Sequence, residues 1–313
     1  DTIITNRETK ASSNTVTIEA EKKDDKVEVT LKDVNIDTSS RNKAAVSVTG
    51  EGDTNIKLNG DNALKSDTYR SGIYGSGSLT ISGGENDSLT AQGGSGADGI
   101  YSSGSLTISG GTVTANGDDG GSTVTANGES GTISGGDGIC SSGGVTISGG
   151  STVTANGGDG QDGYGGGGIR SSSGGVTISG GTVTANGGNS TNSSGGYGIS
   201  SLDVAISSGT VTANGGDSKD GYGGDGIHSN DIDLSGSLEL TAKAGSPNGK
   251  ALSQNGRELD LNAIKDKLGP GAKVTTTDAN GETMQVSIPR PVEPEEPVIP
   301  EESSSSSDGG SAA

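Results

Sequence analysis

The sequence contains no Phe and no Trp, and its six Tyr residues leave aromatics at 2% of 313 residues. A globular core built around large rings is therefore excluded. Cys140 is the single cysteine, so no disulfide within the chain can hold the fold together. The chain also lacks an apolar run of 18 residues, and we expect no membrane insertion.

Proline is scarce, at seven residues, whereas glycine is abundant, at 60 residues. The usual share of glycine is about 7%, so this chain is strongly enriched in it. Without a Gly-x-y period, the composition excludes collagen. Glycine with serine and charge is otherwise typical of disorder, so only periodicity can indicate a fold.

Basic residues are outnumbered two to one, with 20 Lys and Arg against 40 Asp and Glu, which gives a net charge of −20. Residues 71–249 carry 16 of the acids and only three bases. Such a surface repels nucleic acid and attracts cations. We expect no nucleic-acid partner.

An internal repeat dominates the middle of the chain. The dipeptide Gly-Ile recurs at intervals of 27 to 39 residues, with its isoleucines at Ile73, Ile100, Ile139, Ile169, Ile199 and Ile227. Two further blocks follow each Gly-Ile, for example residues 176–181 (VTISGG) and 182–188 (TVTANGG). Apolar and polar residues alternate within each block, which is the strand period of two.

Three short strands per repeat, always in the same order, predict an all-β fold, a three-sided parallel β-helix (solenoid) of about eight coils. Successive coils in such a solenoid lie about 4.8 Å apart. Small and β-branched residues suit its narrow interior. The expected inward residues of one coil are Ile169, Val176, Ile178, Val183 and Ala185.

The repeat divides the chain into three parts. Residues 1–262 are predicted to form the β-helix, 263–288 a small C-terminal cap with a hairpin, and 289–313 a disordered stalk rich in Pro, Glu and Ser. The block TVTANG at 112–117 recurs at 123–128, within a longer unit. Whether the 112–136 insert adds a short coil or loops out stays open.

The first outward position after each Gly-Ile should form one column, made of Tyr74, Tyr101, Cys140, Arg170, Ser200 and His228. This column contains no acid, so we expect no enzyme of the acid/base type. Cys140 and His228 lie three coils apart, about 14 Å at the usual strand spacing, too far for a nucleophile and its base. Both are expected to face solvent.

All six tyrosines lie between five residues before and one residue after a Gly-Ile isoleucine, at Tyr69, Tyr74, Tyr101, Tyr164, Tyr197 and Tyr222. Exposed aromatic rings on one side of a solenoid favour a platform for sugar rings. Tyr74 and Tyr101 would stack on sugars, with Tyr164 and Tyr222 nearby. Arg170 and His228 would hydrogen-bond the ligand. The alternative is that the rings only cover a strand face.

The loops before Gly-Ile carry a second pattern of side-chain oxygens. Two columns are expected, Asp159, Asn189 and Asp217 in the first, and Asp162, Asn192 and Asp220 in the second. Ca²⁺ takes six to eight oxygen ligands of these kinds. The alternative is a set of solvated turns rich in Asp and Gly.

Two further expectations concern the loops. The Asn that ends each third strand (Asn116, Asn127, Asn156, Asn186, Asn214) is expected at a left-handed turn position, with its amide stacked on the next coil. The longest glycine-rich loops are expected to be mobile, because glycine costs the most entropy to order.

Residues 225–229 (DGIHS) and the LTISGG blocks resemble the carbohydrate-binding β-helix domains of Gram-positive bacterial surfaces, which share the pectate-lyase-like fold. Residues 31–35 (LKDVN) and 58–62 (LNGDN) are similar to the opening coils of that family. The resemblance covers about residues 14–262. It implies a right-handed helix, polysaccharide binding without catalysis, and Ca²⁺ in Asp-containing turns, which adds Asp225 to the candidate ligands.

Together these patterns predict non-catalytic, calcium-assisted binding of a polysaccharide, with uronate polymers as a candidate. Because the sequence begins at Asp1 and needs no disulfide, we expect an exported monomer of the bacterial cell surface or cell wall. Two alternatives stay open. One is a structural spacer or adhesin without glycan binding, and the other is a polysaccharide lyase that uses Arg170 as base.

Overall fold

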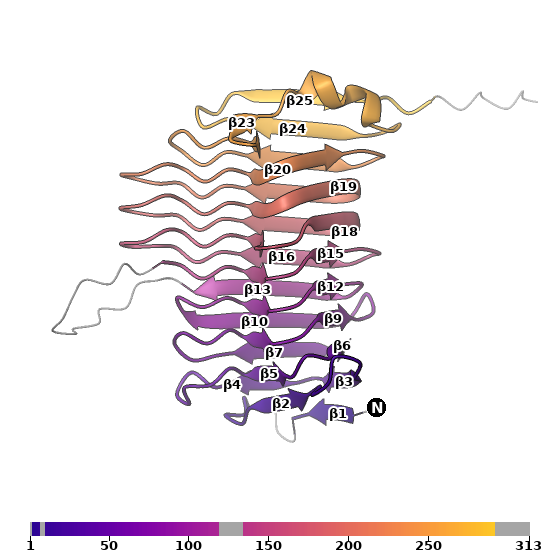
Figure 1. Ribbon diagram of the computed structural model, residues 1–313, viewed down its shortest axis with the longest axis vertical. Coiled ribbons are helices and arrows are strands. Elements are labelled where there is room, and N and C mark those ends of the chain that lie inside the picture. Colours follow the sequence, from indigo (N-terminus) through magenta and orange to yellow (C-terminus); the bar gives the residue numbers. More distant parts are fainter. Residues whose placement is uncertain (1, 7–9, 119–133, 292–313) are drawn as a thin grey trace, which may run out of the picture.

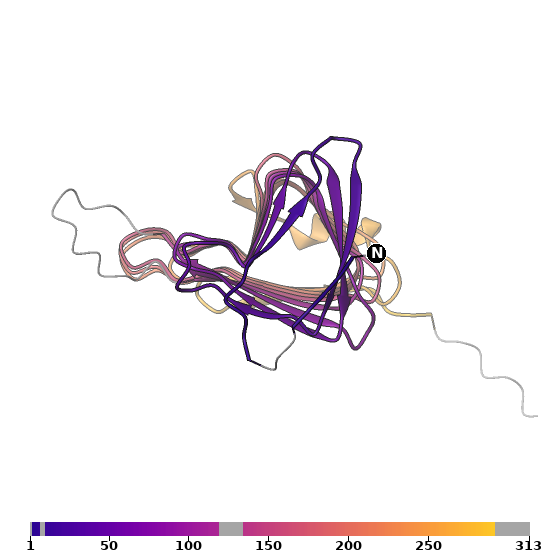
Figure 2. The ribbon, with the colours of Figure 1, turned by 90° about the horizontal axis from the view of Figure 1, so that it is seen from below.

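The computed structural model describes residues 2–6, 10–118 and 134–291 of the chain. These residues form a right-handed parallel β-solenoid of about eight coils, stacked from the N-terminal end to the C-terminal end (Figure 1). Viewed along its axis, the solenoid has three sides around a narrow interior (Figure 2). The predicted fold class is confirmed.

Each side is a parallel ladder that takes one strand from every coil. Side 1 contains β2 (Val16–Glu19), β5 (Val46–Thr49), β8 (Ile73–Gly75), β11 (Ile100–Ser102), β14 (Ile139–Ser141), β17 (Ile169–Ser171) and β22 (Leu252–Gln254). Side 2 contains β1 (Thr2–Thr5), β3 (Lys26–Lys32), β6 (Asp53–Asn59), β9 (Leu79–Ser82), β12 (Leu106–Ile108) and β15 (Val145–Ile147). Side 3 contains β4 (Asn35–Asp37), β7 (Asp61–Lys65), β10 (Ser88–Ser95), β13 (Thr112–Asp118), β16 (Thr152–Asn156), β21 (Glu239–Lys243) and β24 (Lys273–Thr277).

Three longer strands turn the corners without a break. β18 (Val176–Asn186) runs through sides 2 and 3, β19 (Ile199–Asn214) through all three sides, and β20 (Ile227–Leu234) through sides 1 and 2. Their registers match the repeat residue for residue at Ile169↔Ile199↔Ile227.

The core is a single column of small and branched residues inside the three sides. The five inward residues expected for one coil, from Ile169 to Ala185, are all fully buried. Leu31, Ile56 and Leu64 fill the same interior in the N-terminal coils. The absence of large rings therefore matches the width of the interior.

Glycine-rich loops join side 3 to side 1 and project from one edge of the solenoid (Figures 1 and 2). We call residues 134–138, 157–168, 187–198 and 215–226 the glycine flange. Each complete loop has an outgoing leg and a returning leg. The Gly166 N–H donates to the Gly158 carbonyl at 2.8 Å across the two legs, and the Gly188 N–H donates to the Gly166 carbonyl at 2.8 Å one coil on.

Hydrogen bonds also join each outgoing leg to the next coil. Gly157 donates to Asn186 and Gly160 donates to Asn189, each at 2.8 Å, so donors three residues apart reach the same neighbouring leg. The expectation of mobile loops is replaced by a hydrogen-bonded stack, because glycine lets the legs approach closely enough to bond.

Asparagines at the end of side 3 form a ladder of amides. The Asn186 side chain donates to Asn156, and the Asn214 side chain donates to Asn186, each at 2.8 Å. The predicted stacking of these amides is confirmed, but their predicted left-handed conformation is wrong. Each of these residues lies within a strand and none has a positive φ.

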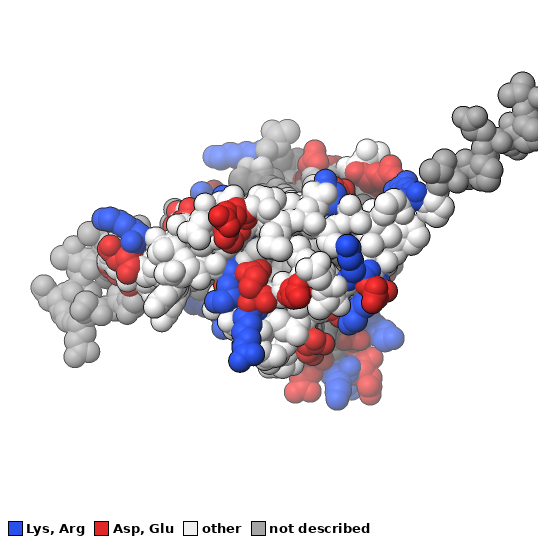
Figure 3. All heavy atoms as spheres, turned by 90° about the horizontal axis from the view of Figure 1, so that it is seen from above, with Lys and Arg blue, Asp and Glu red and all other residues white. Residues whose placement is uncertain are grey.

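The C-terminal end is covered by a 3₁₀ helix and a hairpin. The helix η1 (Leu261–Lys267) begins at Asp260, whose side chain accepts the Asn262 N–H, and it buries Leu261 and Ile264 over the interior. β25 (Thr283–Ser287) pairs antiparallel with β24, which itself extends side 3. Acidic and basic side chains are interspersed on this end (Figure 3).

Two sequence-based expectations lie outside the described residues. The second copy of the duplicated block, at 123–128, is one of them, so the path of the 112–136 insert stays a question. The stalk expected at 289–313 is the other, except for its first three residues.

The glycine flange gives a test of the fold. A Cβ on Gly166 would overlap the Gly136 carbonyl oxygen of the preceding coil, whereas a Cβ on Gly150 has no neighbour within 4 Å. We expect Gly166→Ala to destabilise the protein by about 2 kcal/mol or more, since backbone must shift. Gly150→Ala should change stability by less than about 1 kcal/mol. Thermal unfolding of both variants measures the difference, and equal melting temperatures would contradict the flange.

Candidate functional site

The outward column predicted on side 1 is present. Strand registers align Tyr74 with Tyr101, Tyr101 with Cys140 and Cys140 with Arg170. The same register continues through Ser200 to His228 and Ser253. These side chains therefore follow one another along the solenoid axis, one per coil.

At the N-terminal half of this column, Tyr74 and Tyr101 form a stacked pair. Their ring centroids are 5.3 Å apart and the rings are within 9° of parallel. Tyr74 is 42% exposed, so part of its ring is accessible to a ligand. The pair lines a groove of about 680 Å³, which we call the N-terminal groove, together with Lys43, Tyr69 and Arg70.

Cys140 does not face solvent as expected, because it is buried between its column neighbours. Burial, and then the negative charges of Asp137 and Asp98, raise the pKa of the Cys140 thiol. A thiol that stays protonated is a poor nucleophile. The burial of Cys140 could not be predicted from its outward position, because the neighbouring carboxylates of Asp98 and Asp137 come from another position of the repeat.

Two carboxylates that the column did not reveal lie beside it. Asp98 and Asp137 occupy the position two residues before each Gly-Ile isoleucine, on consecutive coils. The Asp98 carboxylate accepts the Asp137 N–H at 2.8 Å, and the Asp137 carboxylate accepts the Gly167 N–H at 2.6 Å. The second oxygen of Asp137 pairs with Arg170 at 3.5 Å. The sequence signal was the shared Asp-Gly-Ile spacing.

The two carboxylates influence each other's protonation. Burial, and then the charge of Asp137, raise the pKa of Asp98 to about 7. Burial also raises the pKa of Asp137, while the Arg170 guanidinium and the Gly167 N–H oppose the rise. A carboxylic acid and a carboxylate one strand spacing apart form an arrangement capable of acid/base chemistry. Here both also accept backbone hydrogen bonds, which is a structural role.

Beyond Arg170, a second aromatic pair lies on the same face. Tyr197 and His228 stack with centroids 4.4 Å apart and planes within 8°. The His228 Nδ1 lies 2.7 Å from the Asp225 carboxylate, whose other oxygen accepts the Lys250 N–H at 2.7 Å. Asp225 therefore orients the imidazole. Tyr197 was absent from the predicted site residues, although it shared the Gly-Ile spacing with the other tyrosines.

Tyr164 and Tyr222 lie on the returning legs of the flange and are well exposed, at 62% and 65%. Tyr164 lines a pocket of about 420 Å³ with Asp137, Arg170 and Tyr197, which we call the central pocket. Tyr222 lies two coils further along the flange, with Ser194 between the two tyrosines. The structure therefore brings Tyr164 to Arg170 and leaves Tyr222 apart from it.

The two oxygen columns of the flange are in register, and their oxygens have partners within the protein. Asp159 accepts the Asn189 N–H at 2.6 Å, Asn189 accepts the Asp217 N–H at 2.8 Å, and Asp217 accepts the Ser246 N–H at 2.8 Å. In the second column, the Asn192 amide donates to Asp162 at 2.8 Å, and Asp220 follows one coil on.

These contacts do not fit a calcium site. A hard cation needs several oxygens converging on one point. In the flange, one oxygen each of Asp159, Asp162, Asn189 and Asp217 instead accepts a backbone or amide N–H of the next coil. In the part of the chain that the structure describes, no three His, Cys, Asp or Glu residues are grouped to hold a metal. Calcium binding to these columns stays a prediction.

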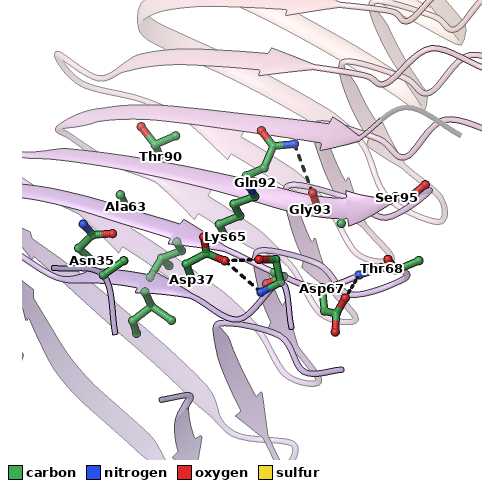
Figure 4. Close-up of a pocket in the computed structure, with 16 residues that line it drawn as sticks. Asn35, Asp37, Ala63, Lys65, Asp67, Thr68, Thr90, Gln92, Gly93 and Ser95 are labelled. Carbon is green, nitrogen blue, oxygen red and sulfur yellow. Dashed lines mark hydrogen bonds between the residues drawn. The ribbon is translucent and has the colours of Figure 1, made fainter. Parts of the chain in front are cut away.

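A further hollow of about 650 Å³ lies on side 3 of the N-terminal coils (Figure 4). Asp37 and Lys65 line it, and hydrogen bonds from Ser39 lower the pKa of Asp37. No aromatic ring lines this hollow. The stacked rings therefore favour side 1 as the functional face.

No helix in the described residues has the length and apolar character of a membrane span.

A sequence model of the beta-helix repeat matches residues 145–168, 176–201 and 204–231. Each of these three segments begins on side 2 of one coil and ends close to side 1 of the next. The chain is thus a parallel β-helix protein that carries this repeat. Comparison with curated proteins and with solved structures finds no match.

The buried carboxylate pair predicts a pH dependence of stability. The pKa of Asp98 in the folded protein, about 7, lies above its ordinary value of 3.8. Between these values the folded protein keeps a proton that the unfolded chain has lost, so this contribution to stability is present at low pH and is lost as the pH rises toward 7.

Asp98→Asn should remove that dependence, because an amide does not titrate in this pH range. The amide oxygen can still accept the Asp137 N–H, so the hydrogen bond between the coils is kept. We expect the melting temperature of the native protein to fall more steeply from pH 5 to pH 8 than that of the variant. Asp203→Asn, at an exposed position, is the matched control. Parallel pH profiles for the native protein and Asp98→Asn would rule out the assignment.

The flange contacts predict a weak response to calcium. We expect added Ca²⁺ or excess chelator to leave the melting temperature unchanged, because folded-state binding is what would raise it. Differential scanning fluorimetry on a calcium-stripped sample measures this. A clear rise with Ca²⁺ that Asp159→Ala or Asp217→Ala abolishes would establish the site that the sequence predicted.

Proposed function

We propose that this chain binds polysaccharide along side 1 without cleaving it. The observation that carries the proposal is the pair of aromatic stacks, Tyr74 with Tyr101 and Tyr197 with His228, on one face of the solenoid. Pyranose rings present apolar C–H faces that pack on exposed aromatic rings. Aromatic side chains with polar tips are well suited to such a surface.

The spacing of the column supports a polymeric ligand. Tyr101 and Tyr197 belong to coils three steps apart, about 14 Å at the usual strand spacing. A single sugar ring does not span that distance, whereas an oligosaccharide lying parallel to the solenoid axis does. Arg170 lies between the two stacks, with its side chain 55% exposed, and can donate hydrogen bonds to ligand oxygens.

The contacts of Arg170 and Asp137 favour binding of the polysaccharide without cleavage. A lyase reaction would need Arg170 as a base, but its guanidinium is engaged in an ion pair with the Asp137 carboxylate at 3.5 Å. The Asp98 and Asp137 carboxylates both hold the backbone of the next coil. We place the protein at the bacterial cell surface as part of the same proposal, where polysaccharides are abundant.

The test is retention on polysaccharides. We expect the double variant Tyr74→Ala/Tyr101→Ala to lose roughly tenfold or more in affinity for the polysaccharide that the native chain binds, since aromatic anchors dominate such surfaces. Affinity electrophoresis through gels containing neutral or acidic glycans measures the change.

Met284→Ala is the control, because Met284 is a large exposed apolar residue on β25, away from side 1. It should bind as the native chain does. If no glycan retards the native chain, the proposal is wrong. Equal retention of the double variant and the native chain would favour a spacer or adhesin whose tyrosines only cover the strand face.

A further inference from the structure

The N-terminal groove differs in charge from the rest of the molecule. Its lining contains two basic residues, Lys43 and Arg70, and no Asp or Glu. The whole chain carries a net charge of −20, so this groove is a local exception. A cleft lined by one sign of charge raises the local concentration of ligands of the opposite sign.

Both cations are available to a ligand. Among the described residues, four ion pairs form, and neither Lys43 nor Arg70 takes part in them. The Arg70 guanidinium makes only long contacts, at 3.4 Å, with the side-chain oxygen of Asn42. A guanidinium has five donors, so most of its hydrogen-bonding capacity stays unused.

Asp67 is the nearest carboxylate along the chain to Arg70, and it is engaged elsewhere. It accepts the backbone N–H groups of Thr68, at 2.7 Å, and of Asn42. Its side chain also lines the hollow on side 3 (Figure 4). The charge of the groove is therefore not cancelled from within its own lining.

The groove combines these cations with aromatic surface. Tyr69, 62% exposed, has a positive φ of 58°, an unusual conformation for a bulky residue. Its N–H donates to the Ser95 carbonyl at 3.1 Å, one coil on, which holds this conformation. Tyr69 and the stacked pair of Tyr74 and Tyr101 thus line one groove with both basic residues.

We propose that the N-terminal groove is a subsite for an anionic sugar, whose ring packs on Tyr74 and Tyr101 and whose negative group lies between Lys43 and Arg70 without a bridging metal. This rests on the proposed function and names the class of sugar. The central pocket lacks this selectivity, because the charge of Arg170 is matched there by Asp137. A carboxylate and a sulfate ester share the chemistry that the groove recognises.

The experiment compares polymers that differ only in charge. Polygalacturonate and its fully methyl-esterified form test the carboxylate, and a sulfated galactan and its desulfated form test the sulfate, all in excess chelator. We expect the native chain to bind at least one anionic polymer about tenfold or more tightly than its neutral counterpart, since hydrogen bonds to charged groups are the stronger ones. Added salt should weaken that preference.

Lys43→Gln/Arg70→Gln should remove the preference for the anionic polymer and leave binding of the neutral one unchanged. Lys57→Gln/Lys65→Gln changes the net charge equally on sides 2 and 3 and should keep the preference. The pair of polymers that shows the preference tells carboxylate from sulfate.

Three results would overturn the inference. They are equal binding of charged and neutral polymers, loss of binding in chelator alone, and an equal effect of the two double variants. If no polymer binds at all, the proposed function fails as well. If polymers bind but charge makes no difference, only the anionic subsite is wrong.

Discussion

The hydrogen-bonded register between successive coils is the constraint on which the rest of the structure depends. Because each coil repeats the same path, a residue type placed once in the repeat becomes a column along the axis. The core, the amide ladder of Asn156 and Asn186, and the outward column of side 1 are all products of that register. The flange extends it to backbone outside the strands, where glycine replaces side-chain packing with close contact between legs.

Much of this architecture could be predicted from the sequence, because the period fixes which residues share a column. The inward set from Ile169 to Ala185 and the outward alignment of Tyr74, Tyr101 and Arg170 followed from counting alone. How deeply an outward side chain is buried could not be predicted from the period in the same way. Cys140 occupies an outward position and is nevertheless buried, since Asp98 and Asp137 come from another position of the repeat and lie beside it.

The flange marks the other limit of sequence reasoning. Asp159, Asn189 and Asp217 had the composition of cation ligands, but the direction of each side chain depends on the backbone conformation of the leg. In the structure, one oxygen of each of these residues accepts the N–H of a residue in the next coil. Tyr164 and Tyr197, on the returning legs, line the central pocket together with Arg170 of side 1.

The flange also has a mechanical consequence. Strand ladders on three sides resist separation of the coils, but a narrow solenoid could still twist about its long axis. The legs lie away from that axis and are bonded both to each other and to the coils before and after them, at Gly158, Gly166 and Gly188. Because they are bonded at a distance from the axis, they resist rotation of one coil relative to the next. The angle between successive coils is therefore fixed along the flange. The stack of Tyr197 and His228 therefore keeps a fixed orientation relative to Arg170 on the preceding coil.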